Sequence, residues 1–285
     1  MELATQLITY GVLMGLVFAF ISLGLSLIFG VMDIVNFAHG EFLMVGMYVA
    51  VLFSSYLPLD PLVSLPFAAA IGFFLGIISY RLLITHILRG PMVAQLFGTF
   101  GLMLFLRYLF MFIFGPDVRT ISHGVLVGKT ISLGWVSLDA SKVMAAGSCV
   151  LLFAFVYWLI NRTKLGRALR ATSLDAEAAR YMGIDTEKMN ALAWGIGGAT
   201  VGLAGGLLAH FYYTTPTVGM LFILIAFATV ALGGFGSISG AFLAGIIIGL
   251  IQVLGGHYLS ELKFTFIYMA YFLTVVLRPR GLFGW

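Results

Sequence analysis

Ionisable side chains are rare inside the apolar stretches of this sequence, and the few found there are the ones that could do chemistry. Asp33, His39 and Glu41 lie between two apolar runs, and Arg107 interrupts a third. Charged groups at membrane depth are costly, so they are candidates for function. The first three could line a polar pathway, relay a proton, or lock a helix break, with Asn36 or Asp33 accepting from free backbone N–H groups. No other apolar run holds a central Asp or Glu, so a break beside a pathway is favoured over a proton relay.

The residue types that enzymes use are scarce. Cys149 is the single cysteine, which excludes an intrachain disulfide and a cysteine-based metal site. Residues 124–130 are similar to a phosphate-binding loop, but His123 stands where the first glycine is required. Arg107 is expected to reach outward or to pair with a neighbouring segment rather than to bind a substrate carboxylate. We therefore expect no catalytic residue, bound cofactor or metal in this chain.

The elements that must position these residues are membrane helices. The chain has 285 residues, of which 61% are hydrophobic and 9% charged, whereas soluble domains average about 45–50% and about 25%. One all-α, polytopic transmembrane domain over 1–285 is predicted, which excludes most enzymes and nearly all nucleic-acid binders. Glycines between 195 and 206 have spacings typical of closely packed helices. Apolar runs occur at 3–29, 42–57, 62–80, 92–114, 143–160, 191–211, 220–232, 241–254 and 264–277.

Several runs are separated by glycine-rich or polar breaks, at 30–40, 86–91 and 233–240. Broken or re-entrant helices are tolerated at membrane depth only where protein or water surrounds them, so the pattern favours a transporter or channel. His39 to Leu43 is echoed by Ser239 to Leu243, where three of the five residue types agree. The echo is either an internal repeat that marks a pathway or a chance similarity.

Basic residues predict the orientation, because Lys and Arg concentrate on the cytoplasmic side. They cluster in a loop at about 161–190, in a turn with Arg81 and Arg89, and in a tail with Arg278 and Arg280. The loop at about 115–142 is then periplasmic, the N-terminus is outside and the C-terminus is cytoplasmic. The chain crosses nine times if 220–232 spans fully, and eight times if it is re-entrant. The first run lacks the basic flank of a secretory signal, so it is expected to be a retained span.

The cytoplasmic loop contains signals for a short capped helix. Thr172 and Asp175 have the spacing of a capping box, and Leu174 and Met182 lie on one helical face with Ala178. Gly183 is placed to end this helix, and Asp185 or Thr186 to cap the following span. A helix this short is marginal in water, so we expect it to dock on a soluble partner. The alternative is a solvated connector.

Four motifs in order resemble the permease subunits of branched-chain amino-acid ABC importers, and most closely their LivH-type branch. They are Asn36 to Phe42 followed by Gly46-Met47-Tyr48, Gly166 to Ala171 with Ala178-Ala179-Arg180 and Gly183-Ile184, Ala231 to Ala241, and Arg278 to Gly284. The resemblance runs nearly end to end. Relatives of this family also carry urea, short amides and carboxylates, so the motifs do not select the solute.

The resemblance implies a subunit of the bacterial cytoplasmic membrane, surrounded by lipid, with a homologous second permease. Two cytoplasmic ATPases would hold the ATP and Mg²⁺, and a periplasmic or surface protein would bind the substrate. The residues implied for ATPase coupling are Arg170, Leu174, Asp175, Glu177, Ala178, Arg180, Met182 and Gly183. Those implied for the translocation pathway are Asn36, His39, Gly40, Glu41, Gly234, Gly236 and Ser237. The alternative function is an ion-coupled secondary transporter of a small polar solute.

Overall fold

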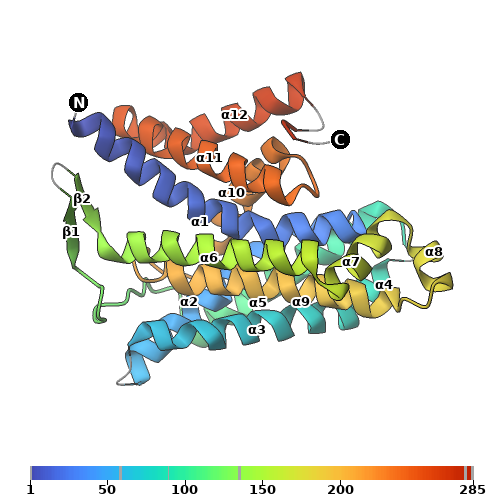
Figure 1. Ribbon diagram of the computed structural model, residues 1–285. Coiled ribbons are helices and arrows are strands. Elements are labelled where there is room, and N and C mark those ends of the chain that lie inside the picture. The colour runs from blue at the N-terminus through green and yellow to red at the C-terminus, as the bar shows by residue number, and fades with distance from the viewer. Residues whose placement is uncertain (1, 58–59, 89, 134–135, 279–280, 284–285) are drawn as a thin grey trace.

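A computed structural model describes residues 2–57, 60–88, 90–133, 136–278 and 281–283. Most helices run roughly along one axis and form an elongated bundle (Figure 1). The N-terminus lies at the same end of the bundle as a β-hairpin, and a pair of short helices lies at the other end. The basic residues Arg89 and Arg280 fall outside the described residues, as do Pro279 and Gly284 of the last sequence motif.

The helices follow the apolar runs closely. Long helices are α1 (Glu2–Met32), α2 (His39–Tyr56), α3 (Leu65–Ser79), α5 (Met92–Phe114), α6 (Ala140–Arg162), α9 (Thr186–Leu208), α10 (Val218–Gly233), α11 (Ile238–Tyr258) and α12 (Lys263–Leu277). Short helices are η1 (Pro61–Ser64), η2 (Tyr80–Ile84), α4 (Thr85–Ile87), α7 (Lys164–Leu174), α8 (Ala176–Tyr181) and η3 (Ser260–Leu262). A π-helical turn at η2 joins α3 to α4, so helical structure continues to Ile87, into the region where a break was expected from 86.

Seven helical segments of the described chain are long and apolar enough to cross a membrane. This confirms a polytopic helical membrane protein. Helix α10 has 16 residues and is therefore about 24 Å long, less than the roughly 30 Å of a hydrocarbon core. Among the seven, α1 and α9 are the most enclosed by protein and α12 the least.

Glycines bring the central helices into contact. A Cβ on Gly15 of α1 would lie 2.6 Å from the Cα of Ile246 in α11. A Cβ on Gly72 of α3 would overlap the carbonyl oxygen of Gly198 in α9. Backbones can approach this closely only where side chains are small, so these glycines fix the helix pairs α1–α11 and α3–α9. The close packing predicted from the glycines of 195–206 is confirmed.

The loop at 115–142 contains a β-hairpin that the sequence reasoning missed. Strands β1 (Thr130–Leu133) and β2 (Val136–Asp139) pair antiparallel. The hydroxyl of Tyr10 donates to the carbonyl of Ser137 at 3.1 Å, which ties the hairpin to the start of α1. The Asp139 carboxylate accepts from the Ser141 N–H at 2.9 Å and caps α6. The loop is therefore folded against the bundle.

Candidate functional site: two half-helices and a helical pair at the bundle end

Helix α2 begins inside the bundle, beside the middle of α1. His39, its first residue, donates from Nε2 to the carbonyl oxygen of Ile21 at 2.9 Å, well before α1 ends at Met32. The chain turns back at Asp33, which has a positive φ of 54°. The side-chain oxygen of Asn36 accepts from the Ala38 N–H at 3.0 Å. The expected break is thus present, and its polar residues bind backbone groups.

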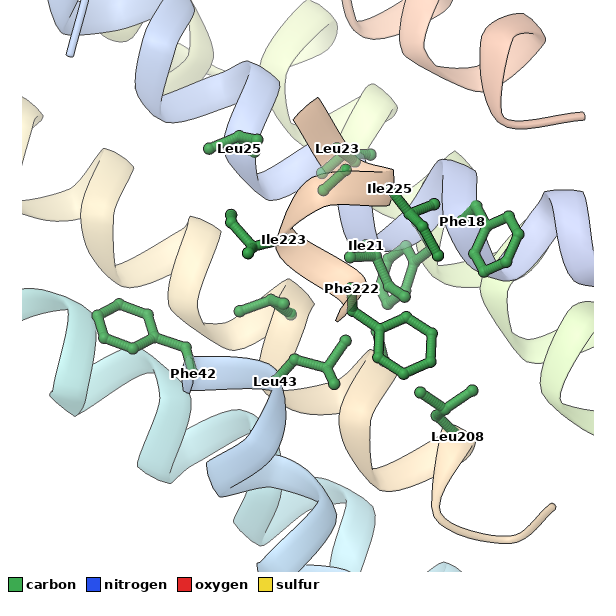
Figure 2. Packing of buried hydrophobic residues seen from close by; sticks show 14 of the residues in the cluster. Phe18, Ile21, Leu23, Leu25, Phe42, Leu43, Leu208, Phe222, Ile223 and Ile225 are labelled. Carbon is green, nitrogen blue, oxygen red and sulfur yellow. The ribbon is translucent and has the colours of Figure 1, made fainter. Parts of the chain in front are cut away.

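Helix α10 also begins inside the bundle. After α9 ends at Leu208, residues 209–217 lead back toward the interior, and Thr214 pairs with Arg119 of the loop that carries the hairpin. A Cβ on Gly40 would overlap the carbonyl oxygen of Gly219, in the first turn of α10. The N-terminal ends of α2 and α10 therefore meet. Figure 2 shows Leu43 of α2 and Phe222 of α10 in the same buried cluster as Ile21 of α1.

The two half-helices leave their meeting point in opposite directions. Ser54, near the end of α2, accepts a hydrogen bond from His123 of the hairpin loop. Gly236, just after α10, packs against Gly30 at the other end of α1, with a separation of 3.0 Å from a Cβ on Gly30 to the Gly236 Cα. The chain therefore turns back from α1 into α2 at one end of the bundle and from α9 into α10 at the opposite end, so the two helix pairs have opposite orientations.

An ion pair lies beside this meeting point. Arg107 of α5 donates to Glu41 Oε1 from Nη2 at 2.6 Å and from Nε at 3.1 Å. The Glu41 side chain is fully buried and that of Arg107 is 11% exposed. The expected pairing of Arg107 with a neighbouring segment is confirmed, and the partner is a carboxylate that the sequence had singled out separately. The pair joins α5 to the first turn of α2.

Positively charged groups lie on more than one side of the buried Glu41 carboxyl group. Its second oxygen, Oε2, has no hydrogen-bond partner among the described residues and lies against Gly219, 2.7 Å from where a Cβ would be. Helix N-termini carry a partial positive charge, and the first turns of α2 and α10 converge here. Half-helix ends that meet inside a bundle are the arrangement by which many transporters contact solutes.

The other predicted pathway residues lie elsewhere. Gly234, Gly236 and Ser237 form the turn between α10 and α11, at the end of the bundle that carries α7. Ser237 Oγ accepts from the Gly240 N–H at 3.1 Å and caps α11. The structure therefore places the seven pathway candidates in two groups, one at the meeting point with Asn36, and one at the bundle end.

The expected capped helix is in fact two helices. Thr172 is not a cap, because it lies within α7 and its hydroxyl donates to the Ala168 carbonyl. Asp175 is the cap, and its carboxylate accepts from the N–H groups of Glu177 and Ala178, both at 2.9 Å. An aspartate that binds the backbone ahead of it competes with helix continuation, so α7 ends and α8 begins there.

The end of α8 and the start of α9 agree with the sequence. Gly183 has a φ of +83°, a conformation that suits glycine after a helix. Asp185 caps α9 by accepting from the Lys188 N–H at 3.0 Å. A hydrogen bond from the Lys188 side chain, supported by this backbone bond, lowers the pKa of Asp185 from its usual range.

The α7–α8 pair exposes large apolar side chains. Leu174 is 87% exposed, and Tyr181 and Met182 are each 82% exposed. Tyr181, which the sequence reasoning missed, donates from its hydroxyl to Glu177 Oε1 at 3.1 Å; its signal was the seven-residue spacing from Leu174. Arg180 turns back and donates from Nε to Thr186 Oγ1 at 2.6 Å.

Arg170 differs from the other coupling candidates because it faces the bundle. It donates from Nη1 to the side-chain oxygen of Asn161 and from Nη2 to the Asn161 carbonyl, both at 3.1 Å. It lines a cavity of about 430 Å³ to which Gly236 and Ser237 also contribute. The structure thus brings one predicted coupling residue together with two predicted pathway residues.

Comparison with known proteins places the chain among membrane permeases. Residues 7–277 match the family described as the permease component of the branched-chain amino acid transport system, and the chain belongs to this family. A probable branched-chain amino acid transport permease protein LivH of Methanocaldococcus jannaschii is 34% identical over 85% of this chain and 78% of its own length. The high-affinity permease LivH of Salmonella typhimurium is 29% identical, over 96% and 93%.

A high-affinity branched-chain amino acid transport system permease, BraD of Pseudomonas aeruginosa, is 28% identical over 98% of this chain and 95% of its own length. The autoinducer 2 import system permease LsrC of Escherichia coli is also 28% identical, over 70% and 55%. Relatives that are named for different solutes are therefore similar to this chain in sequence. No solved structure matches this chain.

Proposed function

We propose that the chain is the transmembrane subunit of an ATP-binding-cassette importer, in which it forms part of the pathway for branched-chain or related amino acids. The family membership supports a permease, and the names of the relatives support the solute class. The observation that carries the coupling to ATP is the exposed apolar surface of Leu174, Tyr181 and Met182, hereafter the docking surface. ATP and Mg²⁺ would be bound by partner ATPases.

The proposed topology has nine crossings, with the N-terminus outside and the C-terminus in the cytoplasm of a bacterial inner membrane. Three observations support it. Tyr10 and the hairpin lie at the bundle end opposite α7–α8, and the basic loop 161–190 carries α7–α8. Residues 209–217 together with the short helix α10 extend from the hairpin end, where Thr214 pairs with Arg119, to the end that holds Gly236.

The proposed pathway passes the meeting point of α2 and α10, next to the Glu41–Arg107 pair. Helices α5 and α12 are the least enclosed of the candidate spans, and they flank α2 and α10 respectively. A homologous second permease packed over α5 and α12 would enclose the meeting point from the remaining side. A periplasmic or surface binding protein would deliver the solute at the hairpin end.

The docking surface is tested by charge substitution. Leu174→Asp combined with Met182→Asp should abolish recovery of ATPase subunits when the tagged chain is purified from its host in mild detergent. A buried hydrophobic contact cannot accommodate two unpaired carboxylates. The matched control is Tyr258→Asp, at a side chain that is 79% exposed near the opposite end of the bundle.

Solute uptake by proteoliposomes distinguishes the outcomes. ATP-dependent uptake that the double variant loses and Tyr258→Asp retains supports the importer. Uptake by the chain alone without ATP, unchanged in the double variant, would refute the importer and support an ion-coupled secondary transporter.

A further inference from the structure

A crevice between α6 and α11 has a charged end and an apolar end. The charged end is the cavity of about 430 Å³, which Arg170 and Asn161 line together with Ser26, Ser237 and Ser239. The apolar end is a groove of about 330 Å³ lined by Phe153, Ala154, Phe242 and Leu243. Tyr157 and Ser239 line both, so the two hollows adjoin. Figure 1 shows α6 and α11 on either side of α1, with α7 at one end.

The charged end is suited to an anion. Arg170 donates only to neutral groups of Asn161 and forms no ion pair within the described part of the chain. Ser26 Oγ is fully buried and has no hydrogen-bond partner among the described residues. The first turn of α11 adds the positive end of a helix dipole. These groups would together satisfy the oxygens of a phosphate.

The apolar end is suited to a hydrocarbon chain. Phe153 and Phe242 pack with their ring centroids 4.6 Å apart and line the groove. Both helices, α6 and α11, are among the seven segments able to cross a membrane, so the groove lies between two candidate spans. A basic residue at one end of such a groove lies where lipid head groups are found.

We propose that this crevice is a binding site for an anionic glycerophospholipid, whose phosphate binds Arg170 and whose acyl chain lies against Phe153 and Phe242. A free phosphate would use only the charged end, and a lipid without a phosphate only the apolar end. Because the two ends share Tyr157 and Ser239, one molecule that fills both is favoured. A lipid bound there contacts α7 and so connects the docking surface to the bilayer. The inference uses only the membrane placement of α6 and α11, and it stands if the docking surface is wrong.

Native mass spectrometry of the purified full chain, titrated with dioleoylphosphatidylglycerol or with dioleoylglycerol, which lacks the phosphate, tests the charged end. Arg170→Gln should weaken phosphatidylglycerol binding about fivefold and leave dioleoylglycerol binding unchanged, whereas Arg170→Lys should retain the preference for phosphatidylglycerol. Arg167→Gln is the matched control, because Arg167 is exposed on the same helix and does not line the cavity. Equal effects of Arg170→Gln and Arg167→Gln would overturn the proposal.

The apolar end is tested by filling it. Ala154→Trp should reduce binding of both lipids, whereas Leu151→Trp, at an exposed position of the same helix outside the groove, should not. Glycerol 3-phosphate serves as the soluble anion. If glycerol 3-phosphate displaces bound phosphatidylglycerol as strongly as added phosphatidylglycerol does, and Ala154→Trp has no effect, the site binds a free anion and the lipid assignment is refuted.

Discussion

Removal of the Arg107 charge should destabilise the bundle more than removal of both members of its ion pair. Arg107 makes two charge-assisted hydrogen bonds to one oxygen of Glu41, at 2.6 and 3.1 Å, and the Glu41 side chain has no exposed surface. Arg107→Met therefore leaves a buried carboxylate without its cation, a change that costs about 3–5 kcal/mol in proteins. In Glu41→Gln/Arg107→Met no charge remains buried, so the double variant should recover a large part of this loss.

The assay is thermal unfolding of the detergent-purified chain in a double-mutant cycle. With about 2–4 °C per kcal/mol, the scale for domains of 150–250 residues, Arg107→Met should lower Tm by roughly 6–20 °C. The control Arg81→Met, at an exposed position, should change stability by no more than about 0.5 kcal/mol. The reasoning is refuted if Arg107→Met melts with the parent, or if the double variant loses the sum of the two single losses.

Two further perturbations follow from the packing and from the caps. Gly72→Val should prevent recovery of a monodisperse chain in size-exclusion chromatography, because its side chain would overlap the Gly198 carbonyl, whereas Gly101→Val, with open space around it, should elute like the parent. A hydrogen bond from Lys188 lowers the Asp185 pKa from 3.8. The ionised Asp185 carboxylate should therefore stabilise the start of α9 fully above pH 3.8. This stabilisation should be lost only as the pH falls through the lower pKa that Asp185 has in the folded chain. Hydrogen exchange at 186–189 across pH 2–5 measures this, and protection in Asp185→Asn that falls over the same interval would contradict it.

The sequence predicted where each helix lies along the chain better than how deep inside the bundle it begins. Apolar runs and capping residues located the elements, because those signals are local. The meeting of α2 with α10 could not be predicted, since it depends on Gly40 contacting Gly219, far away in the chain. The echo between His39 and Ser239, which is either an internal repeat or a chance similarity, relates the start of α2 to the start of α11 rather than to that of α10. Helix α11 begins beside the end of α1, whereas α2 begins beside its middle.

Some parts of the candidate site were predicted and others were not, again because contacts between residues far apart in the chain cannot be predicted from local signals. Glu41 and Arg107 were each noticed as isolated charges, but only the fold shows that they pair. Thr172 and Asp175 gave a correct signal for a helix start and a wrong residue for the cap, because two competing caps are only three positions apart. Tyr181 was missed, because its seven-residue spacing from Leu174 does not by itself show that the side chain is exposed.

The pairing of α1 with α11 also determines the order in which the molecule can be assembled. Gly15 of α1 and Gly245 of α11 both lie at that contact, and a ribosome adding about 5–20 residues per second needs roughly 10–50 s to pass from one to the other. During that interval the glycine face of α1 has no partner helix and is covered by lipid or by the insertion machinery. A chain that stops before α11 leaves the glycine face of α1 without its partner helix. A finished subunit therefore differs from an aborted one in whether this face is covered by α11.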